Sequence, residues 1–167
     1  NDVDASQHAI SQLADGGRKR IAMINHDLSY KYARLRERGY KSVLHLRDLN
    51  YQAVEYARDL SPSAGMAAMQ NLLKDNPPDA VFAVSDTLAA GALRAIQQAG
   101  LRVPEDIAVV GFDGTELAEM ISLTTIEQPS RDIGRKAVDL LLNKIDNPDA
   151  PTERVMLDWR FISRAST

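Results

Sequence analysis

Residues 81–116, VFAVSDTLAAGALRAIQQAGLRVPEDIAVVGFDGTE, form one strand-helix-strand unit from which the rest of the fold can be worked out. The apolar run 80–84 stops at Ser85 and Asp86, whose side chains can accept hydrogen bonds from the free N–H groups that open a helix. We therefore expect a helix to follow directly, with apolar residues on one face. Gly100 ends it, because glycine adopts the left-handed conformation of a helix end without steric cost.

The second strand of this unit is too apolar to have one face in water. Residues 107–110, IAVV, are β-branched or small and predict a strand buried on both faces, as in a parallel sheet. A helix between two such strands makes a right-handed crossover, and ligands bind beyond the carboxyl ends of the strands. Ser85, Asp86 and Asp113 lie at two of these ends. The predicted fold class is α/β, a mainly parallel sheet with flanking helices.

Length and composition indicate one soluble globular unit. The 167 residues are 44% hydrophobic and 26% charged, and no apolar run approaches the roughly 18 residues that a membrane helix needs. The net charge of −3 argues against a DNA-gripping surface on this piece. The absence of cysteine excludes disulfides and fits the cytoplasm. The chain starts without Met, so we expect it to be a fragment.

Other helices and strands follow from apolar spacing along the chain. Helical spacing predicts helices at 2–14, 30–43, 63–74 and 130–146, with Ser63 and Ser130 as caps. Short apolar runs predict strands at 20–24 and 123–126, and two strands in 153–167 broken near Asp158. Residues 51–62 show no clear pattern.

The two long motifs of the chain resemble those of a known family. SDTLAAGALRAIQQAGLRVPEDIAVVGFDGTE at 85–116 and LTTIEQPSRDIGRKAVDLLL at 123–142 are similar to the effector-binding core of lactose-repressor and galactose-repressor (LacI/GalR) transcription regulators. The resemblance covers residues 2–166. It implies a periplasmic-binding-protein-like (type I) lobe that senses a small polar or sugar-like effector, with no cofactor and no membrane partner.

The resemblance also implies a domain organisation. Residues 1–128 correspond to the C-terminal effector-binding subdomain, residues 129–155 to a return segment of a mostly absent N-terminal subdomain, and residues 156–167 to the terminal strand. The helix-turn-helix DNA-binding domain is absent, so DNA is contacted only through a part of the protein outside this chain. A homodimer is implied near the helix after Asp86, whose small residues Ala89, Ala90 and Ala92 suit close packing across a twofold axis.

Three arginines spaced by two, Arg34, Arg36 and Arg38, cannot all point the same way on a helix, and one of them can turn inward. The segment matches the family pattern A-R-x-R-x-x-G-aromatic, in which the second arginine reaches the effector. The resemblance therefore assigns Arg36 to the ligand. A guanidinium suits a carboxylate, a phosphate or adjacent hydroxyls.

Four further ligand contacts are expected. Asp113 can accept hydrogen bonds from vicinal hydroxyls, or it can cap its own turn. The resemblance places Gln128 towards the cleft and Ser85 where many relatives carry asparagine, and Asp86 adjoins it at the strand end. The position where sugar-responsive relatives carry a large aromatic residue is occupied by Leu60.

No catalytic or metal-binding pattern is present. His8, His26 and His45 are scattered, and none of the hydrolase, phosphate-loop or dinucleotide motifs occurs. We expect no enzyme activity and no metal. Two alternatives stay open: a secreted solute-binding protein of a transporter with the same fold, and a receiver-like domain phosphorylated on Asp113.

Overall fold

A single six-stranded sheet organises the computed structural model, which describes residues 1–167. The strands lie in the order β2-β1-β3-β4-β5-β6; all neighbours are parallel except β5 and β6. Their bounds are β1 Ile21–Asn25, β2 Ala53–Tyr56, β3 Ala80–Ala83, β4 Ala108–Asp113, β5 Thr124–Glu127 and β6 Arg160–Ile162. The predicted α/β class with a mainly parallel sheet is confirmed.

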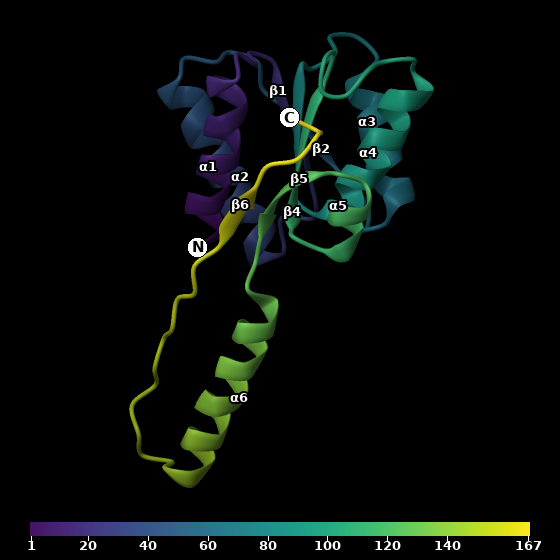
Figure 1. The fold of residues 1–167 in the computed structure, drawn as a ribbon. Helices are drawn as coiled ribbons and strands as arrows, with labels where there is room; N and C mark the ends of the chain where they lie inside the picture. The colour runs from purple at the N-terminus through teal and green to yellow at the C-terminus, as the bar shows by residue number, and fades with distance from the viewer.

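Helices cover both faces of this sheet. Figure 1 shows α1 and α2 on one side and α3 and α4 on the other, which explains why β1, β3 and almost all of β4 are buried. The helix bounds are α1 Asp2–Asp15, α2 Lys31–Leu46, α3 Pro62–Leu72, α4 Asp86–Gln98, α5 Glu116–Met120 and α6 Ser130–Asp146. None of them is both long and apolar enough to cross a membrane.

The strand-helix-strand unit predicted from residues 81–116 is β3, α4 and β4. Ser85 caps α4, since its Oγ accepts a hydrogen bond from the backbone N–H of Leu88 at 3.2 Å. Gly100 has the positive φ of +75° expected of the residue that ends the helix. This unit therefore folds as its sequence predicts.

The small residues of α4 serve packing inside the chain. Ala89 and Ala92 are fully buried. A Cβ atom at Gly91 would overlap the carbonyl of Pro62, and one at Gly65 would overlap the backbone of Leu88, so α3 and α4 touch backbone to backbone. The expectation that Ala89 and Ala92 face a second copy of the chain is wrong, because both are fully buried within one chain, whereas Ala90 is partly exposed.

Two predicted helix caps and one irregular segment differ from the sequence predictions. Ser61, with Pro62 at the first helical position, caps α3 in place of Ser63. Ser130 is the first residue of α6 and makes no capping bond through its side chain to the backbone N–H groups of the helix. The irregular segment 51–62 contains an edge strand, β2, which the sequence hides because its four residues are only partly buried.

Helix α6 and the segment that returns beside it project from the body of the molecule (Figure 1). No residue of α6 is buried, and its apolar side chains Ile133, Val138, Leu141, Leu142 and Ile145 are exposed. Of the two strands predicted in 153–167 only β6 forms. It pairs Arg160 to Ile162 with β5, whereas residues 153–159 have no strand partner.

Candidate functional site

The strand order creates a crevice at the carboxyl edge of the sheet. From β1 the chain passes through α2 to β2 on one side, while β3 lies on the other side of β1. Such a reversal of direction opens a gap between the carboxyl ends of β1 and β3, where α/β proteins bind ligands. Arg36 of α2 reaches this gap, and its Nη1 donates a hydrogen bond to the carbonyl of Val84 at 2.6 Å.

Arg36 is the inward-turning member of the three arginines. It is 5% exposed, whereas Arg34 and Arg38 are exposed to solvent, which confirms that one of them turns inward. Its Nε donates to Oδ1 of Asp2, the first residue of α1, at 2.8 Å. A buried guanidinium needs such partners because an uncompensated charge is costly to remove from water.

Aromatic rings hold the guanidinium in place. The guanidinium carbon of Arg36 lies 3.5 Å from the ring centroid of Phe112 and 5.1 Å from that of Tyr32. Cations are attracted to the negative faces of such rings. With Nε and Nη1 already donating, Nη2 is the nitrogen of Arg36 that donates no hydrogen bond to the chain.

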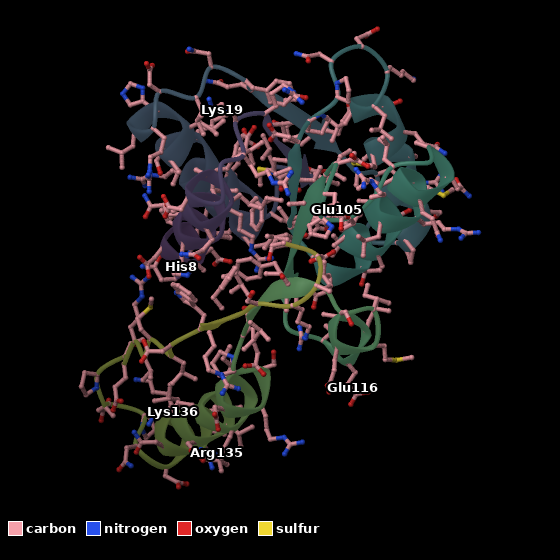
Figure 2. The ribbon with its side chains drawn as sticks, turned by 45° about the horizontal axis from the view of Figure 1, so that its top comes forward. His8, Lys19, Glu105, Glu116, Arg135 and Lys136 are labelled. Carbon is pink, nitrogen blue, oxygen red and sulfur yellow. The ribbon has the colours of Figure 1, made fainter.

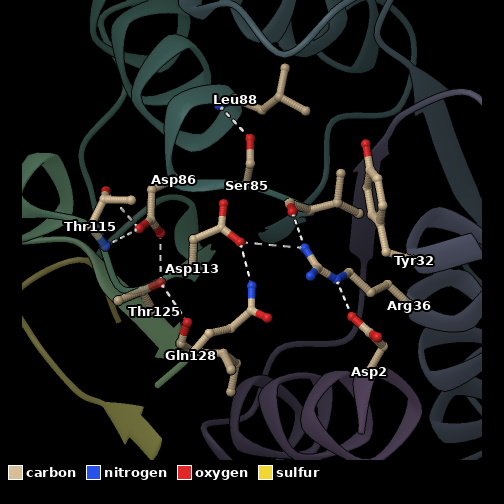
Figure 3. A network of polar contacts seen from close by, with 12 residues as sticks. Asp2, Tyr32, Arg36, Ser85, Asp86, Leu88, Asp113, Thr115, Thr125 and Gln128 are labelled. Carbon is tan, nitrogen blue, oxygen red and sulfur yellow. Dashed lines mark hydrogen bonds and ion pairs between the residues drawn. The ribbon is translucent and has the colours of Figure 1, made fainter. Parts of the chain in front are cut away.

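Asp113 faces Arg36 from the end of β4. Its Oδ1 accepts a hydrogen bond from Nε2 of Gln128 at 2.8 Å and lies 3.8 Å from Nη1 of Arg36 (Figure 3). Burial raises the pKa of Asp113 to about 6, opposed by the positive charge of Arg36 and reinforced by the negative charge of Asp86. Its φ of +116° is unusual for a residue with a side chain. Such strain concentrates at functional positions.

Gln128 reaches Asp113 because their strands are in register. Asp113 of β4 pairs with Glu127 of β5, so the next residue falls beside the carboxylate. The backbone N–H of Gln128 also donates to the carbonyl of Asp113 at 3.2 Å. The structure thus brings together three of the five predicted ligand residues, Arg36, Asp113 and Gln128.

The other two predicted residues are engaged elsewhere. Ser85 is 4% exposed and its hydroxyl caps α4. Asp86 is fully buried: its carboxylate accepts from the N–H of Thr115 at 2.7 Å, from the Thr115 hydroxyl at 2.9 Å and from the Thr125 hydroxyl at 2.6 Å. This geometry favours a structural role for Asp86, which joins α4 to β5 and to the start of α5 (Figure 3).

An aromatic group after β1 was not predicted from the sequence. Tyr30 stacks on His26 with ring centroids 4.9 Å apart, and the Nδ1 atom of His26 lies 2.7 Å from the hydroxyl of Tyr32. Tyr32 in turn covers Arg36. Their position directly after a buried strand, at the same edge as Asp113, was the available signal.

A second polar network fixes the ends of β1 and β2. Glu37 is 6% exposed, and its Oε2 accepts hydrogen bonds from Nδ2 of Asn25 at 2.9 Å and from the hydroxyl of Tyr56 at 3.0 Å. Burial alone raises the pKa of Glu37, but the hydrogen bonds from Lys41, Asn25 and Tyr56 together lower it. This network stabilises the wall of the crevice on the β2 side, where the ring of Tyr56 is half exposed.

A pocket of about 320 Å³ adjoins the cluster. Asp2, Phe112 and Gln128 line it from the body of the molecule, and α6 with the return segment lines it from the other side, through residues that include Ile133, Leu140 and Trp159. No group of three or more acidic, histidine or cysteine residues is placed to hold a metal ion. The arrangement offers one guanidinium donor, one carboxylate and one amide, a set suited to hydroxyl groups.

Comparisons with known proteins agree with this fold. A family model described as "Periplasmic binding protein-like domain" matches residues 10–167. The ribose operon repressor of Haemophilus influenzae is 37% identical over 162 residues, 95% of this chain and 49% of that protein. The chain spans about half the length of the curated relatives it matches.

Solved structures of transcriptional regulators also superimpose closely on this chain. A LacI family transcriptional regulator from Enterococcus faecium with bound ribose superimposes with a TM-score of 0.93 at 30% identity, over 100% of this chain and 63% of that one. The Lac repressor dimer bound to operator and an anti-inducer gives a TM-score of 0.91 at 32% identity, over 100% of this chain and 59% of that one. The relatives are regulators, which favours a regulator over a transporter's solute-binding protein.

Proposed function

The chain belongs to the periplasmic binding protein-like domain family, in which its relatives are transcriptional regulators of the LacI type, and we propose that it is the effector-sensing and dimerising segment of such a regulator. The regulator is a cytoplasmic repressor that responds to a small sugar-like or polar ligand. It contacts DNA through a helix-turn-helix domain outside this chain. The segment binds and signals; it carries out no reaction.

The observation that carries this proposal is the cluster of Arg36, Asp113 and Gln128 at the carboxyl edge of the sheet. The three side chains come from α2, from the end of β4 and from the residue after β5, and they converge within hydrogen-bond or ion-pair distance. The carboxylate accepts from two ligand hydroxyls, while Nη2 of Arg36 donates. Ser85 and Asp86 do not contact the ligand. They act indirectly, by holding the shape of the strand end.

The second half of the pocket is contributed by another lobe. The apolar side chains of α6 point into solvent, although buried apolar area is what stabilises helices of this kind. We assign residues 1–128 to one effector-binding subdomain, residues 129–155 to the return segment of the other and residues 156–167 to the terminal strand. A lobe that covers α6 closes the pocket lined by Phe112, Gln128 and Ile133.

A ligand held between two lobes favours one closure angle. It can shift the regulator between two states only by binding one of them more tightly. Arg36, Asp113 and Gln128 provide this difference, because their contacts to the ligand are completed when the second lobe closes on it. The coupling to operator binding is reciprocal: DNA that selects the open state lowers affinity for the effector.

Dimerisation uses the outer surface of α4 and α5. A shallow groove there is lined by residues with partly exposed apolar atoms: Ala90, Leu93, Leu101, Val103 and Ile121. Met120 beside it is 83% exposed, which is unusual for so large an apolar side chain. Two copies related by a twofold axis bury this groove against itself.

The test uses the complete regulator, operator DNA and gel-shift titration with the ligand that a thermal-shift screen of sugars, purines and sugar acids identifies. We expect Arg36→Ala and Asp113→Ala to abolish effector-induced operator release while operator binding without effector stays unchanged. An unchanged effector titration in both variants contradicts the site. Absence of any operator binding in the complete protein contradicts the regulator and favours the solute-binding alternative.

A further inference from the structure

We propose that Asp2 sets the charge of the ligand that this site accepts: by occupying Nε of Arg36 with a carboxylate, it selects an uncharged, hydroxyl-rich ligand against carboxylates and phosphates. The inference rests on the proposed function, because it concerns the same site. Asp2 is thereby a specificity-determining residue, supplied by the first turn of α1.

Asp2 and Arg36 form a close ion pair. Oδ1 of Asp2 lies 2.8 Å from Nε of Arg36, and the Asp2 side chain is 29% exposed while that of Arg36 is 6% exposed. Asp2 also lines the pocket of about 320 Å³ next to the cluster. The Asp2 carboxylate lines this pocket, whereas Arg36 does not, and Figure 3 shows the carboxylate bonded to the guanidinium.

Arg36 has few donors left for a ligand. A carboxylate or phosphate is bound most strongly by two parallel N–H groups of one guanidinium. Nε is taken by Asp2, so the donor pair of Nε and Nη2 is closed, and one N–H of Nη1 is taken by the carbonyl of Val84, so the pair of Nη1 and Nη2 is partly engaged. The face of the guanidinium towards Phe112 is closed by the ring. A single donor nitrogen, Nη2, suits a hydroxyl oxygen.

The charges around the cluster do not favour an anionic ligand. Two carboxylates, Asp2 and Asp113, face one guanidinium, and Asp86 lies close enough to Asp113 that its charge, like that of Asp2, raises the pKa of Asp113. Lys136 on α6 lines the neighbouring pocket and adds one positive charge. Even with Lys136 counted and Asp113 protonated, the described residues leave no net positive charge for an anion. Arg160 of β6 is paired with Glu127 and adds no net charge.

The negative charge of Asp2 determines the discrimination against anionic ligands. An asparagine keeps an acceptor oxygen for Nε but lacks the charge of the carboxylate, so Asp2→Asn removes the charge and leaves a hydrogen bond possible. The carboxylate adds repulsion against anionic ligands, the kind of repulsive element by which sites discriminate between similar molecules. Removing the charge alone, and then the acceptor as well, separates the two contributions.

The experiment measures binding of inorganic phosphate to the complete regulator by thermal shift at constant ionic strength. We expect wild type to bind phosphate weakly, Asp2→Asn to bind it several-fold more tightly, and Asp2→Ala, which also frees Nε, about tenfold more tightly. Asp4→Asn is the matched control, because Asp4 lies in the same first turn without contacting Arg36. The double variant Asp2→Ala, Arg36→Ala loses the gain.

Identical phosphate affinities in wild type and in both Asp2 variants overturn the proposal. A second arm compares neutral and anionic partners of one shape: ribose with ribose 5-phosphate, and glucose with glucuronate. Tighter binding of the anionic member of either pair to wild type also overturns it. Failure of the proposed function is distinguishable, because it appears as operator binding that no ligand alters, whereas the phosphate series needs no DNA.

Discussion

Asp113 and Gln128, 15 residues apart in sequence, are joined by two hydrogen bonds: Nε2 to Oδ1 at 2.8 Å and backbone N–H to carbonyl at 3.2 Å. The pairing of β4 with β5 places them side by side. The amide therefore fixes the orientation of the carboxylate, and one of its oxygens lies near Arg36. A preoriented acceptor loses little entropy when a ligand binds.

The variant Asp113→Ala is expected to be less stable than the variant Asp113→Gly. At φ +116° glycine relieves a strain that alanine retains, so Asp113→Gly should exceed Asp113→Ala in free energy of unfolding by about 1 kcal/mol, after the larger entropy of the unfolded glycine chain is subtracted. Urea denaturation of both variants measures the difference. Both should lose the effector response, and a more stable alanine variant would contradict the strain.

The titration of Asp113 should make the protein less stable as pH rises. Its pKa of about 6 in the folded state exceeds the ordinary 3.8, so the folded state binds the proton more tightly. This contribution is fully present below about pH 3.8 and is lost as pH rises through about 6. The stability of wild type relative to Asp113→Asn should therefore fall between about pH 4 and pH 7.

Asp106 provides the control for that measurement. Hydrogen bonds from Arg102 lower the pKa of Asp106 to about 2, so its contribution is present above the ordinary 3.8 and is lost only as pH falls towards 2. The stability of wild type relative to Asp106→Asn should stay flat over the range in which the Asp113 comparison changes. A slope in the Asp106 comparison, or none for Asp113, would count against the assignment.

Asp86 is expected to stabilise the fold strongly. Its replacement by alanine leaves the hydroxyls of Thr115 and Thr125 and one backbone N–H without their acceptor in a buried site. We expect a loss of about 3 kcal/mol in free energy of unfolding, measured by chemical denaturation. Asp75→Ala, at an exposed position, is the control and should change stability by less than about 0.5 kcal/mol. A similar small loss for Asp86→Ala would refute the structural role.

Glycines on two helices should respond in opposite directions to alanine. Gly91→Ala forces a methyl group into the carbonyl of Pro62 and the N–H of Met66 and should cost about 2–3 kcal/mol. Gly134 of α6 has nothing within 4 Å of the added methyl group, so Gly134→Ala should stabilise the helix by up to about 1 kcal/mol. Thermal unfolding of the pair checks both; equal effects would contradict the close contact of α3 and α4.

The proposed dimer surface is tested with a bulky charge. Ala90→Arg blocks the groove on α4 and should raise the dimer dissociation constant at least about tenfold in sedimentation analysis of the complete regulator. Ala67→Arg places the same side chain on an exposed position of α3 and should leave the dimer intact. Dimerisation that survives Ala90→Arg unchanged would remove this surface from the account.

The sequence predicted the central strands because their apolar, β-branched runs require burial on both faces. It did not predict β2, because the partly buried residues of an edge strand carry little of that signal. It also placed two strands in 153–167, where only β6 finds a neighbour. Strand pairing is a property of the sheet, which no local pattern contains.

The candidate site was predictable in part. Spacing showed that one of three arginines turns inward, but the resemblance to a family was needed to choose Arg36. Ser85 and Asp86 stand at a strand end as expected, yet their side chains are directed by helix capping and by Thr115 and Thr125. The cap partner of Ser85 is local, but the partners of Asp86 are distant in sequence, and so is the Asp2 contact to Arg36.

A crystal structure of the complete regulator with its effector bound decides whether the cluster of Arg36, Asp113 and Gln128 is the ligand site. We predict effector oxygens within about 3 Å of the Asp113 carboxylate and of Nη2 of Arg36, with Asp2 still bonded to Nε. An effector bound away from both residues, with the cluster of Arg36, Asp113 and Gln128 unchanged, would contradict this prediction.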